Sequence, residues 1–130
     1  DASEQSRAIG GYDEDSGNAE IGVQTVIRKV SKTAATVEFM RHDPQLEGKY
    51  MTGEYFSVEK KNGNQWEALD AKDDVGFKDI GIVIPKDERV SHEYDWTDLY
   101  GELEPGDYRI NVKVWAGDKE YTLSPHFLIR

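Results

Sequence analysis

The chain has 130 residues, no cysteine and a formal net charge of −10. A domain of this size can bury a self-sufficient core, and the lack of cysteine excludes both a disulfide framework and thiol chemistry. The negative charge disfavours nucleic acid and anionic lipid as partners. No apolar run approaches the length of a membrane span, so we expect no transmembrane segment in this chain.

The first twenty residues differ in composition from the rest of the chain. Residues 1–20 are polar and acidic, with Ile9 and Tyr12 as their only sizeable apolar residues. Such a segment buries too little apolar surface to offset the entropy of ordering it. We therefore predict a flexible acidic tether over residues 1–20 and one domain over residues 21–130. The alternative is that part of the tether folds back as an edge strand.

From Ile21 onward, apolar and polar residues alternate in short runs, which is typical of half-buried strands. The runs cover residues 21–28, 35–40, 55–59, 65–69, 80–84, 90–96, 108–115 and 121–129. Asn62-Gly63 and Gly117-Asp118 are tight-turn signals between consecutive runs. The pattern predicts an all-β, immunoglobulin-like Greek-key sandwich of seven to eight strands, with at most one helical turn over residues 97–102.

The most specific motif is Leu-Glu-Pro-Gly-Asp-Tyr, at residues 103–108. In Greek-key sandwiches a tyrosine at the start of a late strand sends its hydroxyl back to the preceding backbone, forming a tyrosine corner. We expect Tyr108 to play that part, with Leu103 filling the core and with Pro105 and Gly106 shaping the turn. This motif predicts structure and no ligand site.

The run Leu-Tyr-Gly-Glu-Leu-Glu-Pro-Gly-Asp-Tyr-Arg-Ile, at residues 99–110, carries a family resemblance, which residues 56–61, Trp66 and residues 94–96 support. The chain resembles the bacterial immunoglobulin-like domains of Gram-positive surface proteins and lipoproteins. The resemblance implies a sandwich fold and a non-catalytic interaction or spacer module. It also implies an extracellular or cell-surface location, with a lipid anchor on a segment removed ahead of Asp1.

Two other functions stay open. The late corner is also similar to that of bacterial intracellular proteinase inhibitors, but an inhibitor needs a protruding rigid loop, and none is identifiable in the sequence. A carbohydrate-binding module needs coplanar exposed aromatic rings. The only candidates for such a platform are Trp66, Trp115, Tyr55 and Tyr121.

The histidines do not predict a metal site. His42, His92 and His126 lie on separate predicted elements without the spacing of zinc ligands. His92 alternates in phase with Tyr94 and Trp96, which favours a packed ring. No nucleophile elbow, phosphate loop or dinucleotide fingerprint occurs, so we expect neither a cofactor nor an enzymatic activity.

The acidic segments are weak calcium candidates. Residues 13–18 resemble the start of a calcium loop, but the glycine comes one position early and Gln24 stands where the bidentate glutamate belongs. Asp70, Asp73 and Asp74 cluster in one predicted loop. We interpret them as a solvated acidic loop, with calcium binding as the alternative.

One outward sheet face has the composition of an interface. By parity, Tyr55 should share this face with Arg109, Lys113 and Trp115 if the strands pair as in immunoglobulin domains. An exposed tryptophan beside arginine and tyrosine is typical of binding surfaces. The two basic residues would form a locally neutral or positive island for an acidic protein or cell-envelope polymer. The alternative is that Trp115 folds over the end of the sheet.

Overall fold

The computed structural model describes residues 6–8, 16–18, 20–41, 48–72, 77 and 80–130. Within them the strands are Ser6–Ala8 (β1), Gly17–Asn18 (β2), Val23–Val30 (β3), Ala34–Arg41 (β4), Tyr50–Asn62 (β5), Gln65–Ala68 (β6), Gly81–Val83 (β7), Arg89–Asp95 (β8), Gly106–Ala116 (β9), Lys119–Leu123 (β10) and His126–Ile129 (β11). One helical turn, Thr97–Tyr100 (α2), follows β8, as expected.

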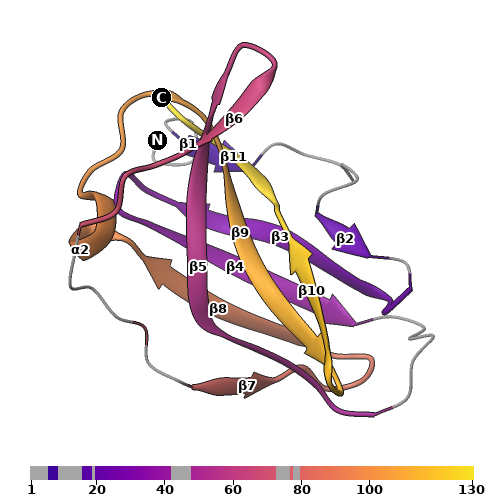
Figure 1. The fold of residues 1–130 in the computed structure, drawn as a ribbon. Coiled ribbons are helices and arrows are strands. Elements are labelled where there is room, and N and C mark those ends of the chain that lie inside the picture. Colours follow the sequence, from indigo (N-terminus) through magenta and orange to yellow (C-terminus); the bar gives the residue numbers. More distant parts are fainter. Residues whose placement is uncertain (1–5, 9–15, 19, 42–47, 73–76, 78–79) are drawn as a thin grey trace.

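The strands form two antiparallel sheets that pack face to face (Figure 1). The larger sheet has the order β1-β11-β9-β5-β6, with β10 beside β9 and β7 beside β5, and the smaller has the order β2-β3-β4-β8. The chain crosses between the sheets after β1, β4, β7 and β8, so the strand that follows each of these lies in the opposite layer. The predicted all-β immunoglobulin-like sandwich is confirmed.

Two long strands, β5 and β9, organise the larger sheet. β5 and β9 pair with each other. On the edge away from that pairing, β5 pairs with the short strands β6 and β7, and β9 pairs with β10 and β11. Both predicted hairpins form. The β5–β6 turn lies one residue later than expected, because Asn62 still pairs with Gln65 and Gly63 takes the positive φ of 63°. Gly117 takes a φ of 67° in the β9–β10 turn.

Residues 50–53, which lie outside the predicted strand runs, already belong to β5. Tyr50 is completely buried, and the Thr52 hydroxyl donates to the Lys113 carbonyl oxygen at 2.8 Å. A buried threonine with its hydroxyl satisfied behaves as an inward strand residue, so alternation of apolar residues alone misses it.

Two pieces of the expected tether lie in the sheets. β1 pairs antiparallel with β11, and β2 pairs with β3. The carbonyl oxygen of Ser16 accepts from both the backbone N–H and the hydroxyl of Thr25, at 2.8 and 2.5 Å. Apart from the bond from the Thr25 hydroxyl, these interactions are backbone pairings, which need no apolar side chains. For these described residues the structure follows the edge-strand alternative.

We expect two truncations to separate the contributions of these pieces. Removing residues 1–20 should lower the free energy of unfolding by about 2 kcal/mol more than removing residues 1–15, because only the longer deletion takes the partner of Thr25. Urea unfolding of both truncated chains measures the difference. Equal stability of the two would show that β2 contributes nothing.

The core lies between the sheets, with three aromatic rings stacked at one end. Phe127 stacks on Trp96 at a centroid distance of 5.6 Å and on Tyr108 at 5.5 Å. The Trp96 indole N–H donates to the Lys32 carbonyl oxygen at 2.7 Å, so the buried ring leaves no donor unsatisfied. Other large side chains that are fully buried include Tyr50, Tyr94, Phe39, Ile21, Ile84, Ile110, Leu123, Val37 and Val58.

The predicted tyrosine corner is present. The Tyr108 hydroxyl donates to the carbonyl oxygen of Glu104 at 2.6 Å, and Leu103 is buried. Gly106 lies against the flexible end of the Lys60 side chain, since a Cβ on it would be 2.9 Å from the Lys60 Cε atom. Burial, followed by the negative charge of Glu104, raises the pKa of the Tyr108 phenol. The corner therefore fixes the crossover from α2 to the start of β9.

Replacing Tyr108 with phenylalanine should destabilise the fold by about 1–2 kcal/mol, because the Glu104 carbonyl loses its donor. Water can partly rehydrate that oxygen, since Glu104 itself is exposed. Urea unfolding measures the loss, with Tyr55→Phe as the matched control at an exposed position. A loss no larger than that of the control would contradict a stabilising corner.

Candidate functional site

The outer face of the larger sheet gathers the predicted site residues. Along β9, buried residues alternate with half-buried ones, so Arg109, Lys113 and Trp115 point away from the core on one face. Their register partners on β5 include Glu59, opposite Arg109, and Met51, opposite Trp115. The predicted parity therefore holds for this strand.

A bulge in β5 places Tyr55 and shapes the surface beside Trp115. Thr52 pairs with Val114 and Phe56 with Val112, so three residues of β5, from Gly53 to Tyr55, stand opposite the single Lys113. Extra residues in one strand break the ladder and redirect side chains. The bulge is anchored from the core, because the buried Tyr94 hydroxyl donates to the Gly53 carbonyl oxygen at 3.0 Å.

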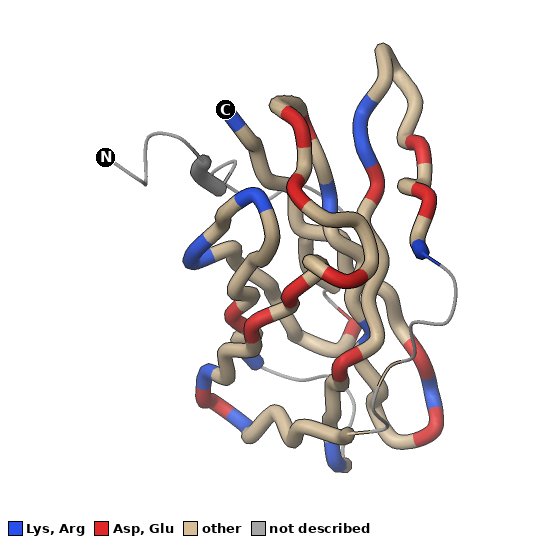
Figure 2. The backbone as a smooth tube through the Cα atoms, turned by 90° about the vertical axis from the view of Figure 1, so that its left-hand side faces the viewer, with Lys and Arg blue, Asp and Glu red and all other residues tan. Residues whose placement is uncertain are grey.

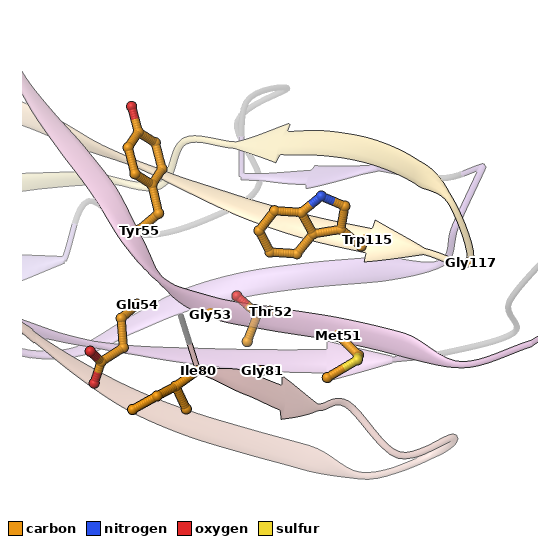
Figure 3. Close-up of a pocket in the computed structure, with 9 residues that line it drawn as sticks. All are labelled: Met51, Thr52, Gly53, Glu54, Tyr55, Ile80, Gly81, Trp115 and Gly117. Carbon is orange, nitrogen blue, oxygen red and sulfur yellow. The ribbon is translucent and has the colours of Figure 1, made fainter. Parts of the chain in front are cut away.

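A groove of about 350 Å³ opens at this bulge (Figure 3). It crosses from β9 over β5 to β7. Its lining residues are Met51, Thr52, Gly53, Glu54, Tyr55, Ile80, Gly81, Trp115 and Gly117. Figure 3 shows Tyr55 and Trp115 projecting from neighbouring strands, with Glu54 pointing away from Tyr55. The structure thus brings two of the four predicted residues together in one depression.

The floor of the groove contains two glycines that face each other across β5 and β7. Gly53 pairs with Gly81 in the register of these strands. A Cβ on Gly53 would lie 2.9 Å from the Ile80 carbonyl oxygen, and a Cβ on Gly81 would collide with the methyl group of Met51. At Gly53 the obstacle is backbone, so a side chain there would force the strands to shift, whereas at Gly81 the flexible end of Met51 could move aside.

The two basic residues of the predicted face are each beside a carboxylate. Arg109 donates to Glu59 at 2.7 Å, and Lys113 lies 3.3 Å from Glu120. Burial alone would raise the pKa of Glu59, but hydrogen bonds from Arg109 and Asn111 outweigh it and hold that pKa below its usual value. The expected island is therefore electrically balanced by its own neighbours.

Arg109 lies at the end of the face away from the groove, beside Trp66. The Arg109 guanidinium sits 4.7 Å from the centroid of the Trp66 ring, and that ring contacts His126 at 4.9 Å. Between this cluster and the groove, the Asn111 amide donates to Ser57 and Glu59. The structure therefore separates the four predicted residues: Arg109 lies at a polar aromatic end, Tyr55 and Trp115 line the groove, and Lys113 stands opposite the bulge between them.

Two of the three histidines pack against aromatic rings, and for His92 the sequence predicted this. His92 meets the Tyr94 ring edge-on at 4.7 Å and lies 4.0 Å from Glu54, and His126 contacts Trp66. His42 lies outside the described residues. The described residues contain no group of three or more histidines and carboxylates placed to hold a metal ion.

The acidic candidates are only partly described. Asp70 is exposed, whereas Asp73, Asp74 and residues 13–15 lie outside the described part of the chain.

None of the helices in the described part is long and apolar enough to cross a membrane.

The groove contains residues that sequence reasoning missed. Met51 and Gly53 lie outside the predicted strand runs, and Ile80 and Gly81 lie in a predicted strand that was given no place in the site. The signal that could have found them is the pair of glycines inside strand-like runs, since such glycines often mark bulges or close approaches.

Two sheets, crossovers between layers and a tyrosine corner define an immunoglobulin-like sandwich domain. The chain belongs to the family of bacterial Ig-like domains, whose family model matches residues 16–128. That match begins at Ser16, where the contacts of the β2 segment with Thr25 begin. No curated protein and no solved structure matches the chain. Bacterial Ig-like domains commonly occur in extracellular or surface proteins.

Proposed function

We propose that this domain is a non-catalytic interaction module of a secreted or cell-surface bacterial protein, and that its partner docks on the outer face of the larger sheet. The observation that carries the proposal is the groove between Tyr55 and Trp115. Most of its lining residues are apolar or aromatic. Tyr55, on one side of the groove, is 49% exposed. Concave apolar sites with few polar groups are where proteins bind ligands and partners.

The groove is also preorganised, which lowers the cost of binding. The Tyr94 hydroxyl holds Gly53 from below, and the Thr52 hydroxyl ties β5 to β9. Surfaces that need no rearrangement lose less entropy when a partner docks. Tryptophan and tyrosine are the residues that most often dominate binding energy.

A protein partner accounts for this face better than a sugar platform does. Of the four candidate aromatic residues, only Tyr55 and Trp115 line the groove. Trp66 sits against Arg109, and Tyr121 donates to Glu20 at 3.2 Å. The four rings are therefore not assembled into one exposed surface.

Capture from the native cell envelope tests the proposal. The domain is immobilised as wild type, as Trp115→Ala and as Trp66→Ala, the last being the matched control at the other end of the same face. Losing a tryptophan hot spot costs about 2 kcal/mol or more, so Trp115→Ala should retain at least about ten-fold less material. Trp66→Ala should bind as the wild type does. Equal capture by folded Trp115→Ala and wild type would refute the proposed site.

The captured material identifies the partner class. Protease treatment of the envelope fraction should abolish capture, whereas enzymes that degrade polysaccharide should leave it unchanged. The opposite result would assign the groove to a cell-envelope polymer.

A further inference from the structure

One hydrogen-bonding edge of the short strand β7 is not paired with any other strand in the described part of the chain. Ile84 N–H donates to the Tyr50 carbonyl oxygen at 2.9 Å, and Ile82 stands opposite Thr52. Bonded pairs alternate along an antiparallel ladder. The backbone groups of Gly81 and Val83 therefore point away from β5, toward the rim of the sandwich, where no described strand pairs with them (Figure 1).

Exposed apolar side chains concentrate around this edge. The large hydrophobic residues that the described chain leaves exposed are Tyr55, Phe77, Ile80 and Val83. Phe77 contacts the Tyr55 ring edge-on at 5.1 Å, Ile80 directly precedes β7, and Val83 is the last residue of β7. Contiguous exposed apolar surface of this kind marks interaction sites.

Several other edge strands of the described sandwich carry charge and β7 does not. β2, Gly17–Asn18, is also uncharged, but it has no apolar side chain. Natural sheets blunt exposed edges with charged side chains. β6 carries Glu67, β8 carries Arg89 and Glu93, and β10 carries Lys119 and Glu120. The sequence of β7 is Gly-Ile-Val, with no charge. An unprotected apolar edge next to a preformed groove fits a surface that another strand covers.

We propose that an extended basic segment of a partner polypeptide adds as a strand to the free edge of β7 and places one apolar side chain in the Tyr55–Trp115 groove. The inference rests on the proposed function and names its partner class. Strand addition takes its affinity from main-chain hydrogen bonds and its specificity from pockets for alternate side chains. The outward backbone groups of Gly81 and Val83 provide the main-chain hydrogen bonds. The groove, which begins at Ile80 and Gly81, provides a pocket for a side chain.

Charge selects the occupant. The domain carries a net charge of −10, and Glu54 is the charged member of the groove lining. Figure 2 shows acidic positions along the side of the sandwich that bears β7, β8 and α2, and Glu93, Asp95 and Asp98 on it are exposed. Two basic residues are also there: the exposed Lys86, between β7 and β8, and Arg89, which lies 3.6 Å from Glu38. A basic segment is attracted to this side, whereas a second copy of the same acidic domain is repelled.

A random library of 12-residue peptides displayed on phage tests the inference, with the full 130-residue chain as bait. The enriched peptides should alternate apolar with basic residues. Val83→Pro removes one outward N–H and spares the bonds to β5, so it should weaken binding of the synthesised peptides at least ten-fold. Val83→Lys, which keeps the backbone intact, should do the same. Gln65→Lys adds an equal charge on the edge of β6 and should change binding less than two-fold.

Two further readouts show whether the peptide binds as a strand. N-methylation of alternate peptide amides should abolish binding, and the backbone amide signals of Gly81 and Val83 should shift in NMR spectra on titration. The inference is overturned if the library gives no binders, or if binding survives N-methylation and both Val83 substitutions. It is also overturned if the wild type sediments as a dimer that Val83→Pro dissociates, because the edge then serves a second copy.

The outcomes keep this inference separate from the proposed function. If Trp115→Ala abolishes capture of envelope protein while the Val83 variants capture it normally, the face binds its partner without strand addition. If the Val83 variants alone lose binding, the edge is the site and the proposed docking on Trp115 fails.

Discussion

Replacing Trp96 with alanine is expected to lower the free energy of unfolding by about 3–5 kcal/mol, the cost of emptying a large buried site. The Trp96 side chain is completely buried and stacks on Phe127. Its indole N–H also satisfies the Lys32 carbonyl oxygen, so alanine leaves both a cavity and an orphaned acceptor. Urea unfolding followed by circular dichroism measures the loss.

Trp66→Ala is the matched control for this substitution, because Trp66 lies half-buried on the outer face beside Arg109. The control should cost about 1 kcal/mol or less, in keeping with a surface position. If Trp96→Ala costs no more than the control, the stacked rings are not the centre of the core.

The fold should lose about 2–3 kcal/mol of stability between pH 10 and pH 12 because of Tyr94. Burial raises the pKa of this phenol to about 12, against a lowering by a hydrogen bond with Thr52 and a further raising by Glu54. The folded state thus holds the proton more tightly than the unfolded chain, in which the pKa is near 10. The stabilisation is complete below pH 10 and fades as the pH rises through 12.

Tyr94→Phe isolates this effect. The variant should be less stable than the wild type at pH 8, because the Gly53 carbonyl oxygen loses its donor. Its stability should then fall much less steeply above pH 10. Tyr55→Phe, at an exposed position, should keep the alkaline slope of the wild type. Parallel slopes for Tyr94→Phe and wild type would show that another group controls the alkaline loss.

The fold could be predicted from the sequence wherever one side of a strand is apolar. Alternation along residues 108–115 located β9, and the Leu103–Tyr108 run located the corner. Alternation of apolar and polar residues did not locate β1 and β2, which pair through their backbones at the sheet edges. Side-chain patterning carries no information about such pairing, because hydrogen bonds between main chains are available to every residue but proline.

The candidate site was predicted only in part, for a different reason. Parity along one strand placed Arg109, Lys113 and Trp115 on a common face. It could not foresee that Glu59 and Glu120 would neutralise the two cations, since both partners come from neighbouring strands. Nor could it foresee the groove, which forms at a bulge in β5 opposite a glycine on β7. Such features depend on the register between strands, which alternation does not specify.

The pairing of β1 with β11 has a mechanical consequence. Ser6 faces Ile129 and Ala8 faces Phe127, so the outer end of β1 lies beside the outer end of β11. A force that separates Ser6 from Ile129 breaks the backbone hydrogen bonds between β1 and β11 one after another and does not load them all at once in shear. Peeling of this kind needs little force, so β1 would detach first. The long pair of β5 and β9, held by eight residue pairs, would remain intact under that load.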